Sequence, residues 1–197
     1  MASTHEKKSG GSPTERHTSS PASESCLSGS KGFSLSPQLD HGEAPQSRRD
    51  PGTLEKEIRG LFERQKLGVL ATQCSGAPYG NLVAFASSRD ISWLLFVTSR
   101  STRKYENIAA DARVALVIDN RSNELRDFGD AIAVTALGRA VEIEAKEKNT
   151  LLRTYLEKHP NLNGFAKSPS CALFKVDVEK YIIVSRFQNV MELWPNK

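Results

Sequence analysis

The segment that decides the fold runs from Leu67 to Thr98 and reads LGVLATQCSGAPYGNLVAFASSRDISWLLFVT. Apolar and branched residues gather in three short runs, and Gly, Pro, Ser or Asp separates these runs. The spacing predicts strands over 67–73, 81–87 and 91–98, with a turn through Ser75-Gly76-Ala77-Pro78 between the first two. Three strands joined by such short connections form an antiparallel meander.

The segments on both sides of the meander complete the predicted fold. Upstream, Thr53 can cap a helix that extends to about Lys66, with apolar residues at helical spacing. Downstream, the pattern predicts helices over about 102–110 and 145–158, and strands over 113–119, 130–144 and 171–185. Gly138 lies within a strand and predicts a bend or bulge. Six strands with three scattered helices indicate a mainly β fold, a closed or nearly closed six-stranded antiparallel barrel with flanking α-helices.

The first 50 residues differ in composition from the rest of the chain. They contain nine apolar residues and twelve serines, and they show neither helical nor strand periodicity. A segment this polar cannot bury enough surface to fold, so residues 1–50 are predicted to be a disordered low-complexity tail. Residues 51–197 then form one globular domain that is long enough to bury a core.

Charge and cysteine content exclude several classes of protein. The chain has 27 Lys and Arg against 23 Asp and Glu, and its net charge of +4 falls short of the basic stripe of a nucleic-acid-binding protein. The three cysteines lie far apart without metal-ligand spacing, so neither a metal site nor a disulfide framework is expected. No apolar run approaches the roughly 20 residues that span a membrane. We therefore expect a cytoplasmic protein without a nucleic-acid or membrane partner.

The most informative local motif is Thr98-Ser99-Arg100-Ser101-Thr102-Arg103-Lys104, where a strand ends and a helix begins. Unpaired N–H groups and partial positive charge at a helix start attract anions. Ser101 or Thr102 adds a hydroxyl, and the three cations can hold a dianionic phosphate from several sides. The alternative is that Ser101 only caps the helix while the cations lie in solvent. The motif by itself leaves both interpretations open.

The order of elements around this motif resembles the pyridoxamine 5'-phosphate oxidase-like FMN-binding split-barrel family. The resemblance covers the chain from about Thr53 to its end. It rests on the succession of the Gly76-x-Pro78 turn, the strand that ends at Thr98, the Ser-Thr-Arg-Lys helix start and the strand 113–119. It implies that residues 51–197 are a split-barrel domain that binds FMN, and that the protein is a homodimer with each flavin site between two subunits.

The resemblance also implies which residues bind the cofactor. Backbone groups of one strand would contact the isoalloxazine ring: Asn81, Leu82, Val83 and Ala84. The phosphate and the ribityl chain would bind at the strand end and the helix start: Thr98, Ser99, Thr102, Arg103 and Lys104. Arg186 and Gln188, from the C-terminal region of a partner subunit, are candidates to close the pocket.

Departures from the family pattern bear on the activity. Ala133 stands near the position of a flavin-contacting Gln. The chain also lacks the C-terminal Arg-x-His motif that binds substrate in true pyridoxamine phosphate oxidases. We therefore expect an FMN-dependent oxidoreductase that acts on another small-molecule redox substrate. Two alternatives stay open: a barrel without cofactor that serves as an interaction module, and a non-catalytic flavin-binding or haem-handling protein. The turn at 77–81 is similar to the haem-utilisation branch of the superfamily, although no haem-ligating His stands out.

Overall fold

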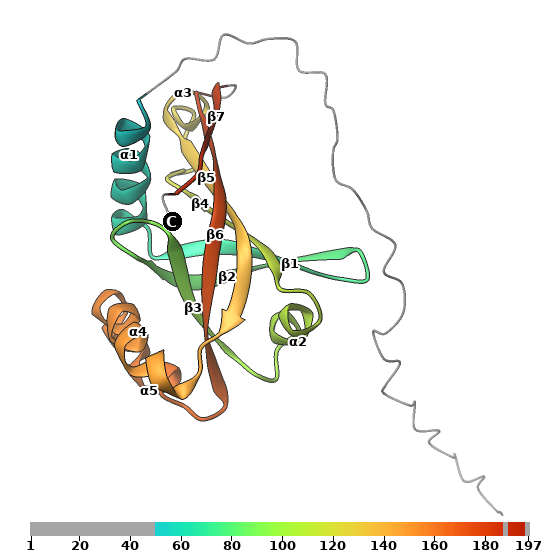
Figure 1. Cartoon of the computed structure of the whole chain (residues 1–197). Coiled ribbons are helices and arrows are strands. Elements are labelled where there is room, and N and C mark those ends of the chain that lie inside the picture. The colour runs from blue at the N-terminus through green and yellow to red at the C-terminus, as the bar shows by residue number, and fades with distance from the viewer. Residues whose placement is uncertain (1–49, 187–188, 196–197) are drawn as a thin grey trace, which may run out of the picture. The chain divides into compact units, whose positions relative to one another are not determined.

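The computed structural model describes residues 50–186 and 189–195 (Figure 1). The tail predicted for residues 1–50 lies outside the described residues except for Asp50. The elements, in chain order, are α1 (Pro51–Arg64), β1 (Leu67–Cys74), β2 (Ala77–Ser87), β3 (Trp93–Ser99), α2 (Arg103–Ala110), β4 (Arg113–Asp119), α3 (Asp127–Asp130), β5 (Ile132–Glu142), α4 (Ala145–Lys158), the 3-10 turn η1 (Pro160–Leu162), α5 (Asn163–Ala166), β6 (Cys171–Ser185) and β7 (Asn189–Leu193).

Six of these strands close into an antiparallel barrel, as predicted. The hydrogen-bonded order is β3-β2-β1-β4-β5-β6-β7, and an additional pairing between β3 and β6 closes the ring. The seventh strand, β7, was not predicted. It pairs with β6 over Tyr181 to Ser185, whereas β3 pairs with β6 over Cys171 to Asp177. The 15-residue β6 is therefore long enough to hold two shorter strands end to end along one edge.

The hairpin between β1 and β2 is tighter than the predicted turn. Ser75 and Gly76 alone form the turn, with φ angles of 51° and 83°. Positive φ at both central residues suits the right-handed twist of the flanking strands, and Gly adopts it without strain. Ala77 and Pro78, which we had placed in the turn, belong to β2 and pair with Cys74 and Gln73.

Helix α1 begins two residues before the predicted cap. Asp50, not Thr53, is the N-cap, and its Oδ2 accepts a hydrogen bond from the Thr53 backbone N–H at 3.2 Å. Pro51 follows at the first helical position, where its missing N–H is no loss. The helix buries its apolar face, Leu54, Ile58, Leu61 and Phe62, in the barrel core.

Aromatic side chains join α1 to the barrel interior. The Phe62 ring lies edge-on to Phe85, with centroids 5.5 Å apart, and 5.9 Å from Tyr181. The buried Tyr181 hydroxyl donates a hydrogen bond to the Ile91 carbonyl at 2.5 Å. Ile91 is fully buried with a φ of 54°, which is rare for a branched residue. Its burial and the tyrosine bond hold the loop between β2 and β3 in this conformation.

The bulge predicted at Gly138 is present in β5. The register between β5 and β6 shifts between Leu137 and Gly138. A Cβ at Gly138 would lie 2.2 Å from the Asp177 carbonyl oxygen. Only glycine lets the two backbones approach this closely.

Helix α4 packs on the outside of β2 and β3 and ends in a half-buried lysine. A second apolar cluster, which includes Ala86, Leu95, Leu152 and Tyr155, lies between the helix and the barrel. The Lys158 ammonium donates a hydrogen bond to the Phe62 carbonyl at 2.7 Å and lies 3.7 Å from the centroid of the Phe85 ring. Burial lowers the pKa of Lys158 to about 8.

This pKa predicts a pH dependence of stability. Lysine has a pKa near 10.5 when unfolded, so between about pH 8 and pH 10.5 the unfolded chain binds more protons than the folded chain. The free energy of unfolding should therefore rise with pH in this window. Urea denaturation at about pH 7.5 and about pH 10 should show the wild type gaining stability relative to Lys158→Met. A wild type that gains no stability relative to Lys158→Met between the two pH values would contradict the lowered pKa.

Candidate functional site

Hydroxyl groups tie the end of β3 to the start of α2. Thr98 is buried, and its Oγ1 lies 3.0 Å from Oγ1 of Thr102. The Thr102 hydroxyl donates a hydrogen bond to the Ser99 carbonyl at 2.8 Å, and Oγ of Ser99 lies 2.9 Å from Oγ of Ser101. These contacts fix the connection that carries the predicted phosphate motif.

The N-terminus of α2 has no side-chain cap. Thr102 occupies the N-cap position, but its hydroxyl turns back to the Ser99 carbonyl. Ser101 lies before this position and bonds to Ser99. Ser101 is therefore not the cap of this helix, and whether the cations face a phosphate or solvent stays a prediction.

Of the three cations in the motif, Arg100 has partners within the chain. Its Nη1 donates hydrogen bonds to Glu142 Oε2 at 2.9 Å and to the Tyr105 hydroxyl at 3.0 Å, and its Nη2 contacts Glu142 Oε1. The Tyr105 hydroxyl donates to the same carboxylate at 3.0 Å. Hydrogen bonds from Arg100 hold the pKa of Glu142 below its usual range. Arg100 is thus neutralised in a structural contact, which corrects the view that all three cations face a phosphate.

Arg103 and Lys104 are different, because no carboxylate in the described part of the chain pairs with either. The Arg103 guanidinium lies 5.5 Å from the centroid of the Tyr79 ring. Lys104 is half-buried, makes no hydrogen bond or ion pair to a described residue, and has a pKa lowered by burial. Two adjacent uncompensated charges at a helix start are suited to an anion.

The strand that carries Tyr79 also presents an amide without partners. Both polar side-chain atoms of Asn81 are buried, and neither has a hydrogen-bond partner among the residues that the structure describes. A buried amide in this state is costly, so it points to a ligand, a water or a second chain. The contact between Arg103 and Tyr79 brings the start of α2 to this strand, two residues from Asn81. The structure therefore brings the two groups of predicted residues toward one another.

One edge of β2 is left open over the predicted flavin-contacting residues. Residues 77–84 pair with β1 on one side, but β2 pairs with β3 only from Phe85 to Ser87. Half of the backbone N–H and C=O groups of 77–84 consequently face away from any strand partner. Side chains alternate along the strand: Val83 is buried in the core, and Leu82 is 65% exposed on the outer face with Ala84.

Arg186 lies far from these residues within one chain. Ser99, at the end of β3, pairs with Cys171 at the start of β6, whereas Arg186 follows the other end of β6. Fourteen steps of extended strand separate those ends by roughly 45 Å. Within one chain, Arg186 thus lies at the opposite end of β6 from the phosphate motif, and its contact with the flavin stays a prediction. Gln188 lies outside the described residues.

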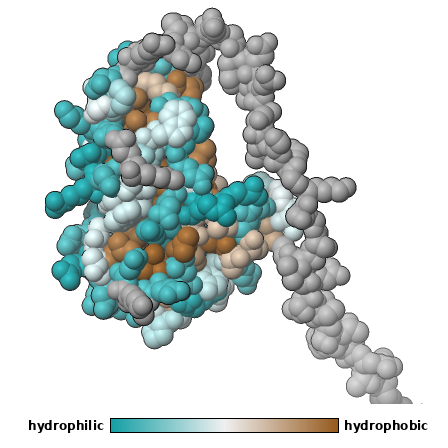
Figure 2. All heavy atoms as spheres, viewed as in Figure 1, coloured by the Kyte–Doolittle hydropathy of each residue, from teal (hydrophilic) through white to brown (hydrophobic). Residues whose placement is uncertain are grey.

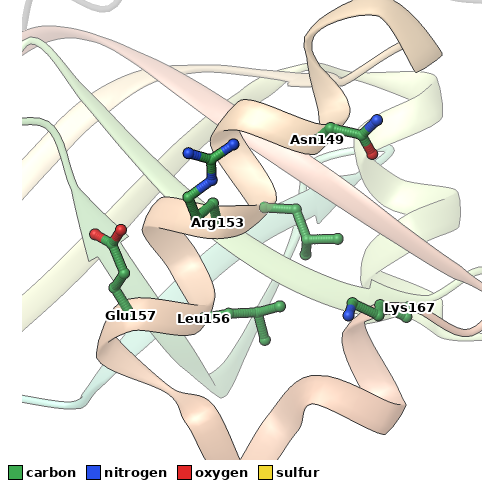
Figure 3. A pocket seen from close by; sticks show the side chains of 6 residues that line it. Asn149, Arg153, Leu156, Glu157 and Lys167 are labelled. Carbon is green, nitrogen blue, oxygen red and sulfur yellow. The ribbon is translucent and has the colours of Figure 1, made fainter.

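Two hollows of the single chain lie beside α4 rather than at this site. The first encloses about 450 Å³ between α4 and the segment after α5, and Figure 3 shows Arg153 and Glu157 extending from α4 away from Lys167. The second encloses about 480 Å³ between α1, the end of β2 and α4. Neither hollow is lined by any predicted cofactor residue.

In the described ranges, no three His, Cys, Asp or Glu residues gather as a metal site, and no helix has the length and apolarity to cross a membrane.

Comparison with known proteins decides the family. The family model described as pyridoxamine 5'-phosphate oxidase matches residues 54–185. The chain belongs to the pyridoxamine 5'-phosphate oxidase family. A comparison of the sequence with curated proteins gave no match.

Solved structures with the same fold as this member of the pyridoxamine 5'-phosphate oxidase family are distant in sequence. The haem-binding protein from Mycobacterium smegmatis is 17% identical with a TM-score of 0.65, over 75% of this chain and 59% of that protein. HutZ, the haem storage protein from Vibrio cholerae, is 18% identical with a TM-score of 0.56, over 64% of this chain and 90% of its own. An FAD-binding protein from Mesorhizobium loti is 18% identical with a TM-score of 0.53, over 65% of this chain and 90% of that protein. This family member thus spans 59% of the length of the mycobacterial protein.

Proposed function

We propose that this chain binds FMN and acts as a flavin-dependent oxidoreductase on a small-molecule redox substrate. The observation that carries the proposal is the pair of uncompensated cations, Arg103 and Lys104, beside a strand with an unpartnered Asn81 amide. FMN carries a phosphate dianion that needs such charges, and a flat ring with polar edges that the open side of β2 can meet. When bound, FMN supplies hydride exchange at its N5 atom.

Each residue of the site has a role that follows from its contacts. Arg103 and Lys104 neutralise the phosphate, and Thr98, Ser99, Ser101 and Thr102 hold the helix start that presents them. The Asn81 amide has both a donor and an acceptor to offer, and backbone groups of Asn81 to Ala84 are available along the open edge of β2. The residues present therefore fit the cofactor, while the chemistry itself belongs to the flavin.

A haem-handling role is the second candidate, because two of the structural neighbours are haem proteins by name. Haem is often held by histidine. His159 is the one histidine within the described residues; it is buried, and its Nε2 lies 2.8 Å from the Phe85 carbonyl oxygen. Only 6% of His159 is exposed and one ring nitrogen is engaged with a backbone carbonyl, so the side chain does not face a surface that could hold a ligand as large as haem, and this arrangement favours the flavin.

Absorption spectra of the purified protein test the proposal against both alternatives. Flavin absorption bands that bleach on mixing with NADH or NADPH are expected of a flavin-dependent oxidoreductase. Flavin bands that no donor bleaches would indicate a binding protein without turnover. A Soret band after addition of haemin to the colourless protein would favour haem handling, and a protein that takes up neither ligand would favour an interaction module.

The proposal includes a homodimer with each flavin site between two subunits. Apolar side chains line the outer face of the barrel, where Leu67, Leu82 and Val190 are 53%, 65% and 54% exposed. Leu82 pairs with Val69 of β1, and Val69 pairs with Val117 of β4. Leu82, Val69 and Val117 therefore form a row across three strands. Figure 2 shows apolar residues, in brown, reaching the surface among polar ones. An outer face of this kind is suited to burial against a second copy, which would also bring Arg186 of the partner subunit within reach.

Light scattering at micromolar concentration should give about twice 21.7 kDa. A Leu67→Glu/Leu82→Glu double variant should shift the protein to the monomer and weaken FMN, because buried carboxylates without partners oppose association. Leu125→Glu is the matched control, since Leu125 is 87% exposed in the turn before α3, outside the barrel strands. A monomeric wild type that holds FMN tightly would overturn the site between subunits.

A further inference from the structure

The second hollow beside α4 carries an arrangement of charges that the proposed flavin site does not use. It lies between α1, the end of β2 with the loop that follows, and α4, and it encloses about 480 Å³. We call it the cation groove and define it by Arg59, Ser87, Arg89, Thr154 and Lys158. Figure 1 shows α1 and α4 on one side of the barrel and α2 on the other. Ser87 is six residues along β2 from Asn81, which is about 20 Å of extended strand.

Lys158 is the centre of the groove. Its ammonium is held by the Phe62 carbonyl at 2.7 Å and by the face of the Phe85 ring at 3.7 Å. The described residues offer it no carboxylate within 4.0 Å. Lysine has three N–H donors, so two remain after the bond to Phe62. A half-buried ammonium with a neutral acceptor and an aromatic ring as its only partners keeps its charge uncompensated.

Arg59 and Arg89 add to this charge. The Arg59 Nε is buried and has no hydrogen-bond partner, and its guanidinium meets Glu55 only at 3.9 Å. Arg89 is exposed and forms no ion pair with any residue that the structure describes. Two carboxylates, Glu63 and Glu157, also line the hollow, but neither pairs with the three cations in the described part of the chain. Among the residues that the structure describes, Lys158 and Arg89 thus have no counter-ion, and Arg59 has only the distant Glu55.

We propose that the cation groove binds the oxyanion of a small molecule, a phosphate or a carboxylate group. The free N–H groups of Lys158, Arg59 and Arg89 can bond to such a group from three elements, as strong charge-assisted hydrogen bonds require. The hydroxyls of Ser87 and Thr154 lie at the same hollow and offer further donors. Phe62 and Ala86 give it apolar walls for the rest of the molecule, and Glu63 and Glu157 disfavour anions of high charge.

Titration of the full chain with inorganic phosphate or malonate, followed by residue-resolved NMR, tests this inference. Amide signals of Ser87 to Asp90 should shift in a saturable way in the millimolar range, beyond the effect of chloride at equal ionic strength. Any phosphate bound at the proposed flavin site shifts the amide signals of Arg103 and Lys104 instead, so binding at the two sites is measured separately. Saturation by only one of the two probes identifies which oxyanion the groove prefers.

Variants complete the test. Lys158→Met and Arg59→Gln should each raise the dissociation constant at Ser87 to Asp90 about 10-fold. Arg89→Gln should raise the dissociation constant by the same factor. Because Arg89 is exposed, this substitution leaves the packing intact, so its effect cannot come from the folding defect that Lys158→Met or Arg59→Gln could cause. Arg153→Gln removes a cation from the same helix outside the groove and should have no effect. Shifts that do not saturate, equal effects of chloride, or equal losses in Arg153→Gln would overturn the proposal.

Discussion

FMN should bind about 100-fold more weakly to the Arg103→Ala/Lys104→Ala variant than to the wild-type chain, whereas riboflavin should bind both proteins almost equally. A hydrogen bond to a charged group contributes about 1.5 to 3 kcal/mol, so each substitution alone should weaken FMN about 10-fold or more. About 100-fold is the sum of the two single effects, and a smaller loss in the double variant would measure the coupling between two adjacent cations that share one phosphate. Fluorescence titration of both flavins gives the dissociation constants.

The contrast between the two flavins separates phosphate recognition from damage to the fold. Riboflavin lacks the phosphate but keeps the ring and the ribityl chain. Arg153→Ala is the matched control, since it removes an exposed cation from α4, on the other side of the barrel from α2. Equal losses for FMN and riboflavin, or no loss for either, would leave Arg103 and Lys104 as surface cations of an ordinary helix start.

Gly138→Ala should destabilise the folded chain by about 3 kcal/mol. The new Cβ would lie 2.2 Å from the Asp177 carbonyl oxygen and 3.1 Å from the Val178 Cα. Both atoms belong to the backbone of β6, so no side chain can turn aside, and either β5 or β6 must move. Because β6 also carries β3 and β7, this movement strains the closure of the barrel. Thermal unfolding should show a fall in Tm of roughly 10 °C.

Gly80→Ala tests whether the loss is specific to the bulge. Gly80 also lies in a strand, but its Cβ would meet only Val69 Cγ1, at 3.8 Å, which is an ordinary contact. Its stability should stay within about 0.5 kcal/mol of the wild type. If both variants unfold at the same temperature, the close approach at Gly138 does not determine the thermal stability of the barrel.

Much of the fold could be predicted because local patterns set it. The strands 113–119 and 171–185 and the helix 145–158 have the bounds that periodicity predicted. Alternation of apolar residues marks a strand wherever one face is buried, and this signal needs no knowledge of the partner strand. The cap was placed at Thr53 instead of Asp50, and the turn was predicted two residues too long, because several adjacent residues were equally able to cap or to turn.

By itself, the sequence determined the order of the six barrel strands and of helices α1, α2 and α4, the bulge at Gly138, and the place where hydroxyls and cations meet a helix start. Only the tertiary structure decided which cations stay free. Arg100 and Arg103 are alike in the local motif, but Glu142, 42 residues from Arg100, neutralises the first, and the second lies over Tyr79. The unpartnered Asn81 amide, the open edge of β2 and the distance of Arg186 likewise depend on how strands far apart in the chain pair. Such pairings are set by closure of the whole barrel, so no local pattern carries them.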